Sequence, residues 1–131
     1  MRLILNKGQK TTGIMNKSVT FQLTARVELD SAEKAALDKY KFGNELVYSK
    51  ENIRPASGAA STTWGGIARN FSAAALNLQL TVQGLITGRT IECKSITEML
   101  DVEETIRSAC EVLKGMLIAC QSFEGETVIE F

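Results

Sequence analysis

Residues 95–121 read SITEMLDVEETIRSACEVLKGMLIACQ and form the longest periodic segment of the chain. Their apolar residues recur at steps of three and four, the spacing that gathers side chains on one face of an α-helix. Ser95 and Glu98 match the Ser-x-x-Glu capping box, which supplies partners for the first free amides of a helix. The segment therefore predicts one long amphipathic helix that begins just after Ser95. Its apolar stripe comprises Met99, Val102, Ile106, Ala109, Cys110, Leu113, Met116, Leu117 and Cys120.

The later turns of this helix, residues 112–119, are apolar over more than one face. A helix with apolar residues on two faces needs cover on both. Either this end of the helix is buried on both sides by its own chain, or its second face meets another subunit.

Strands are expected on both sides of the helix. Gly88-Arg89 offers a turn between an alternating segment and residues 90–94, so the two are predicted to pair as a hairpin. After the helix, Glu124-Gly125 predicts a reversal and residues 127–131 predict a last strand. The apolar positions of the alternating segment are Leu76, Leu78, Leu80 and Val82.

The first 49 residues add three strands and a short helix. Every odd position from 19 to 29 is apolar, which predicts the clearest strand of the sequence, with one wet face. Asp30 and Glu33 predict the capped start of a short helix, which Gly43-Asn44 is expected to stop. The other expected elements are a short strand over residues 2–5, a polar connection over residues 7–13 and a strand over residues 45–49.

Together these elements predict an α+β fold, with an antiparallel-rich sheet of about six strands and one short and one long helix packed on one face. Residues 1–131 are expected to form a single domain, because the strands of the second half need partners from the first. Residues 50–71 are expected to form an extended central loop or arm, since their small and polar side chains have little to bury.

The composition bounds the kind of partner. Fifteen basic and fifteen acidic residues give a formal net charge of zero, without the basic excess typical of proteins that neutralise nucleic-acid phosphates, so nucleic acid is not an expected partner. The apolar runs are too short for a membrane span, and residues 1–5 are too short for a signal-peptide core, so no membrane partner is expected. Cys93, Cys110 and Cys120 are interpreted as reduced, mostly buried thiols of a cytoplasmic protein.

Catalytic chemistry has little support in the residue types. Histidine is absent, so the usual base near neutral pH is missing, and the cysteines lack the spacing of a zinc site. Cys93 beside Lys94 is the one candidate nucleophile. We prefer to interpret Cys93 as a buried residue of a strand. The adjacent acids Glu103 and Glu104 are interpreted as part of a solvated helix face. We therefore expect no enzyme, no catalytic residue, no metal site and no cofactor.

The remaining candidate site is the central loop, where Arg54, Trp64, Gly65, Gly66 and Arg69 lie close together in sequence. An indole offers a flat face for a base or sugar, guanidinium groups fork onto phosphate or carboxylate, and glycines let backbone amides approach closely. In the alternative interpretation, Trp64 and Phe71 pin the loop to the core and the arginines are solvated.

Two functional hypotheses follow. In the first, the chain is a non-enzymatic cytoplasmic binding protein that sequesters a small anionic ligand, such as a nucleotide, at the central loop. The layout resembles that of small bacterial or phage proteins, and a phage sponge for a signalling nucleotide would fit it. In the second, the chain is a structural or assembly subunit that works through protein–protein contacts. Both hypotheses allow a homo-oligomer, which we expect.

Overall fold

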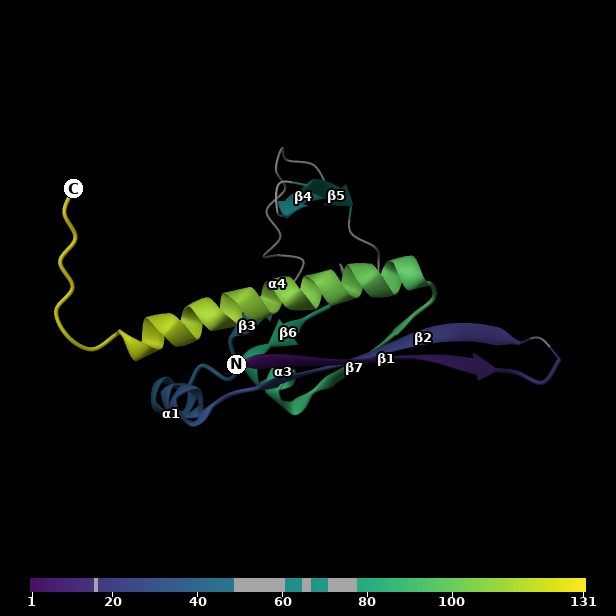
Figure 1. Ribbon diagram of the computed structural model, residues 1–131, viewed down its shortest axis with the longest axis horizontal. Helices are drawn as coiled ribbons and strands as arrows, with labels where there is room; N and C mark the ends of the chain where they lie inside the picture. The colour runs from purple at the N-terminus through teal and green to yellow at the C-terminus, as the bar shows by residue number, and fades with distance from the viewer. Residues whose placement is uncertain (16, 49–60, 65–66, 71–77) are drawn as a thin grey trace.

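The computed structural model of the 131-residue chain describes residues 1–15, 17–48, 61–64, 67–70 and 78–131. Its largest sheet is antiparallel and has three strands in the order β1 (Arg2–Thr12), β2 (Ser18–Glu28) and β7 (Arg89–Cys93). The central strand, β2, pairs Val27 with Leu3 of β1 and Leu23 with Ile91 of β7. In each strand alternate side chains face the same way, so this register puts apolar residues of all three strands on one face. Figure 1 shows this sheet below the long helix of residues 96–121.

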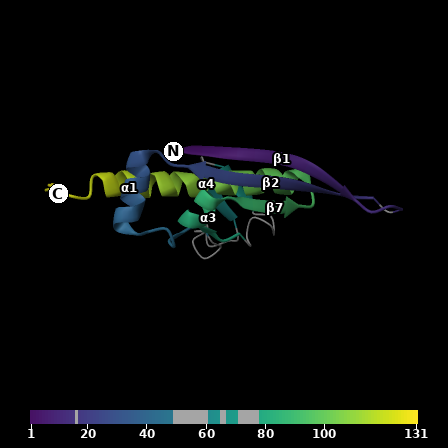
Figure 2. The ribbon, with the colours of Figure 1, turned by 90° about the horizontal axis from the view of Figure 1, so that it is seen from below.

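The long helix α4 (Ile96–Gln121) runs lengthwise along that apolar face (Figure 2). It is one continuous helix, which confirms the prediction for residues 95–121. The core between helix and sheet includes the fully buried side chains of Leu23, Ile106 and Leu113. Removing this much apolar surface from water is the main stabilising contribution to such a fold.

Smaller elements close the end of this core. The short helix α1 (Ser31–Tyr40) packs against α4, and β3 (Leu46–Tyr48) pairs with β6 (Leu80–Thr81) in a separate two-stranded sheet. The one-and-a-half-turn helix α3 (Val82–Thr87) follows β6 directly and buries the side chains of Val82 and Leu85.

The helix caps agree with the sequence in part. At α1 the capping box is complete, because the Glu33 amide donates to Asp30 Oδ1 at 2.8 Å and the Asp30 amide donates to Glu33 Oε1 at 3.0 Å. At α4 the Glu98 amide donates to Ser95 Oγ at 3.1 Å. The stop of α1 was predicted at Gly43-Asn44, but the residue with a left-handed backbone is Lys41, which caps the helix at φ 53°.

The expectation of one six-stranded sheet is wrong. Five strands form two sheets in the body of the protein, and β4 and β5 form a third pair of their own. Within the predicted strand over residues 76–82, only Leu80 and Thr81 are described as strand. The physical reason lies in Thr81, whose hydroxyl accepts from the Gly84 amide at 3.0 Å and so caps α3. Strand β7 therefore pairs with β2 and not with its neighbour in sequence.

Both ends of the chain also depart from the predictions. Strand β1 continues to Thr12, through the segment expected to be a polar connection, because each of its residues pairs with one in β2. Residues 127–131 form no strand and are exposed. A strand needs a partner for its backbone amides and carbonyls, and no described strand lies beside this segment.

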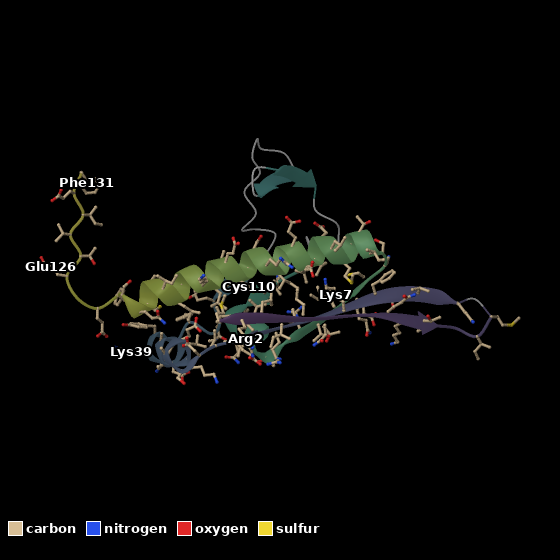
Figure 3. The ribbon with its side chains drawn as sticks, viewed as in Figure 1. Arg2, Lys7, Lys39, Cys110, Glu126 and Phe131 are labelled. Atoms are coloured by element: carbon tan, nitrogen blue, oxygen red, sulfur yellow. The ribbon has the colours of Figure 1, made fainter. Side chains whose placement is uncertain are left out.

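One charged pair lies beside the sheet–helix core. Lys7 of β1 forms an ion pair with Glu103 of α4. Glu103 is only 9% exposed. The interpretation of Glu103 as part of a solvated face is therefore wrong. Burial of a carboxylate is tolerated when an opposite charge pairs with it, and Lys7 supplies that charge (Figure 3).

The packing of α4 predicts unequal effects of two leucine truncations. Leu113 is 0% exposed and Leu100 is 50% exposed on the same helix. Leu113→Ala is expected to lower the free energy of unfolding by about 2–5 kcal/mol, because it leaves a cavity in the core. The matched control Leu100→Ala should change it by less than about 1 kcal/mol. Urea unfolding followed by circular dichroism measures both, and equal losses would contradict the described face of α4.

Candidate functional site

The predicted ligand-binding residues fall on a short hairpin in the middle of the chain. Strand β4 (Ser61–Trp64) pairs antiparallel with β5 (Ile67–Asn70), so part of the expected loop is a two-stranded sheet. Trp64 is opposite Ile67, and Arg69 is opposite Thr62. The pairing therefore brings Trp64 and Arg69 onto neighbouring strands of one hairpin.

The other members of the predicted site lie outside the described residues. These are Arg54, Gly65 and Gly66. A sequence signal for the hairpin was present, since two glycines between short runs favour a two-residue turn. The structure therefore brings two of the five predicted residues into one hairpin.

The thiols offer no activated nucleophile. Burial, and secondarily the nearby Glu98 carboxylate, raises the pKa of the Cys93 thiol, and burial raises the pKa of Cys110 to about 11. A thiol acts as a nucleophile in its thiolate form, so both shifts disfavour reactivity near neutral pH. The interpretation of Cys93 as a buried strand residue is confirmed.

A surface cleft of about 250 Å³ lies between α1 and the end of α4. Its polar groups come from α1 and from the residues just beyond α4: Lys39 forms an ion pair with Glu124, and the Tyr40 hydroxyl donates to Glu124 Oε1 at 3.2 Å. The rings of Tyr40 and Phe123 meet edge to face with centroids 5.5 Å apart. The lining residues are Ala32, Ala35, Ala36, Lys39, Tyr40, Cys120, Gln121 and Glu124.

The charged and polar groups of this cleft shift one another's pKa values. Its hydrogen bond to Glu124 raises the pKa of Lys39, and burial together with Glu124 raises the pKa of Tyr40. Lys39 and Tyr40 in turn lower the pKa of Glu124. Each group is thus held in its ordinary protonation state, so none of them is tuned to accept a proton near neutral pH. The contacts of Lys39 and Tyr40 with Glu124 hold the segment after α4 against α1. These residues are more than eighty positions apart in the chain, so no local sequence pattern predicts the contact.

Exposed apolar side chains gather at the C-terminal end of α4 and in the segment that follows it. Ile118 is 56% exposed, and Val128 and Ile129 are 73% and 70% exposed. Phe131 is fully exposed, and Figure 3 shows it on an extended segment that runs away from the body of the protein. A contact with another macromolecule would remove these apolar side chains from water.

The described part of the chain contains no group of three or more Cys, Asp or Glu side chains placed to bind a metal ion. None of its helices is long and apolar enough to cross a membrane.

Comparison with protein-family models, with curated proteins and with solved structures finds no match to this chain.

The contact between α1 and the last segment should depend on pH. Because the folded contact lowers the pKa of Glu124, it is stabilising above the ordinary carboxyl pKa and is lost as the pH falls through the lowered value. Acidification is expected to separate Phe123 from Tyr40, which NMR contacts between the two rings would report. In Glu124→Gln this acid transition should be absent; a transition that persists unchanged in the variant would contradict the assignment to Glu124.

Proposed function

We propose that this protein is a non-enzymatic assembly subunit that works as a homo-oligomer through protein–protein contacts. The observation that carries the proposal is the exposure of the apolar side chains Ile118 on α4 and Val128, Ile129 and Phe131 on the segment that follows it. A sequence expectation agrees with it, since the later turns of α4 are apolar on a second face.

The buried face of α4 is already occupied by its own chain. Leu113 and Leu117 belong to the core beneath the helix, whereas Ile118 and Val112 point away from that core and remain half-exposed. Of the two explanations for the apolar second face, burial by the described part of the same chain does not apply to these two side chains. Cover by another subunit is the explanation that we adopt.

The proposal predicts the mass of the particle in solution. One chain has a mass of 14.3 kDa, and sedimentation velocity over a range of concentrations is expected to give a multiple of it. Ile118→Asp should shift the particle toward the monomer, because a buried unpaired carboxylate opposes association. Ile14→Asp is the matched control, since Ile14 is exposed at the distant β1–β2 turn. A 14.3 kDa particle at every concentration would exclude a homo-oligomer.

A second candidate function is the binding of a small anionic ligand, such as a nucleotide, on the β4–β5 hairpin. The pairing of β4 with β5 supports it, because the only tryptophan of the chain and Arg69 belong to these two strands. An indole that stacks on a base and a guanidinium that pairs with phosphate are complementary to the two halves of a nucleotide.

Fluorescence tests this second function directly. With a single tryptophan in the chain, titration with a panel of nucleotides is expected to quench Trp64 emission for at least one of them. Arg69→Ala should weaken that binding about tenfold or more, as expected for a lost charge-assisted contact with phosphate. The exposed Arg107→Ala is the control and should bind as the wild type does. Absence of quenching by every nucleotide at millimolar concentration would argue against the ligand.

A further inference from the structure

Strand β1 has an unpaired edge. In the three-stranded order β1-β2-β7 it lies at the margin, and no described strand pairs with its outer side. Figure 2 shows β1 along one border of the molecule. Its eleven residues form a long edge that exposes unpaired amides and carbonyls, the kind of edge onto which another strand can add.

The edge also leaves apolar surface incompletely covered. Leu3 and Leu5 lie on the inner face of β1 and pack against the core, but each remains half-exposed. A strand added beside them would cover this surface, provided that its own inward side chains were apolar.

The last residues of the chain have the composition of such a strand. Residues 127–131, TVIEF, combine β-branched and aromatic side chains of high strand propensity, yet they are exposed and form no strand here. Their alternation would put Ile129 and Phe131 on one face and Glu130 on the other. Ile129 and Phe131 would then contact the partly buried side chains of Leu3 and Leu5.

The remaining charges of the two segments are complementary. Strand β1 carries Arg2, Lys7 and Lys10, of which Arg2 pairs with Glu28 and Lys7 with Glu103. Residues 122–131 carry Glu124, Glu126 and Glu130, of which Glu124 pairs with Lys39. Lys10 is therefore left to attract Glu126 and Glu130, and because both segments belong to this chain, we take a second copy as the occupant.

We infer that residues 127–131 of one copy add as a strand to the outer edge of β1 in a second copy. The inference rests on the proposed homo-oligomer and names the surfaces that form it. Backbone hydrogen bonds supply the affinity, the apolar face of the added strand covers Leu3 and Leu5, and opposite charges orient the two segments.

Proline substitution tests the pairing, because proline lacks the amide proton that a paired strand donates. Ile129→Pro is expected to weaken association about tenfold or more in sedimentation equilibrium. Met15→Pro places the same residue in the exposed β1–β2 turn, outside both segments of the proposed pairing, and it should leave association within about threefold of the wild type. Hydrogen exchange adds a local readout: dilution should speed exchange of β1 amides in the wild type, and in Ile129→Pro they should exchange fast at all concentrations.

The outcomes separate this inference from the proposed function. A homo-oligomer that Ile129→Pro leaves intact would overturn strand addition and leave the assembly function standing. Protection of β1 amides that does not change on dilution would show pairing within one chain and would overturn the second copy as the occupant. A monomer under all conditions would overturn both.

Discussion

The packing of one apolar face of α4 on the inner face of the β1–β2–β7 sheet is the contact on which the rest of the structure depends. The sheet has only three strands, and its central strand supplies the buried Leu23, Ala25 and Val27. A sheet of this size is stable in water only when a helix or a second sheet covers its apolar face. The length of α4 matters for the same reason, since a single helix lies along most of the sheet, and only the turn end of the β1–β2 hairpin projects beyond it (Figure 2).

That contact also explains the Lys7–Glu103 pair. Lys7 lies opposite Leu23 in the register and so belongs to the inner face, where the helix carries Glu103. Each charge alone would oppose burial beside the core, whereas the pair allows both residues to lie there. A polar pair at this place also constrains how α4 lies along the sheet, because sliding the helix by one turn would separate the two charges.

The zero net charge conceals a separation of charge along the chain. Residues 1–27 contain five basic and no acidic residues, whereas residues 122–131 contain three glutamates and no basic residue. The segment of opposite charge to the first strand is therefore at the other end of the same sequence. The proposed contacts between copies would bring these two oppositely charged segments together.

The sequence by itself determined the elements whose signals are local. The period of the apolar residues, together with Ser95 and Glu98, predicted α4, and strict alternation predicted β2, because both patterns follow from which side chains one face of a helix or strand presents. Trp64 and Arg69 were proposed as site residues from their residue types, and the β4–β5 pairing that joins their two strands was not predicted.

Only the tertiary structure decided which segments pair. An alternating run fits a strand, but Thr81 caps a helix there, and Val82 and Leu85 reach the core from α3. Residues 127–131 have strand propensity but no partner within the described chain, and propensity does not replace the hydrogen bonds that a partner supplies. The pairing of β7 with β2, the burial of Glu103 and the contact of Tyr40 with Glu124 all join residues far apart in the chain, so their physical cause is packing, which no local pattern records.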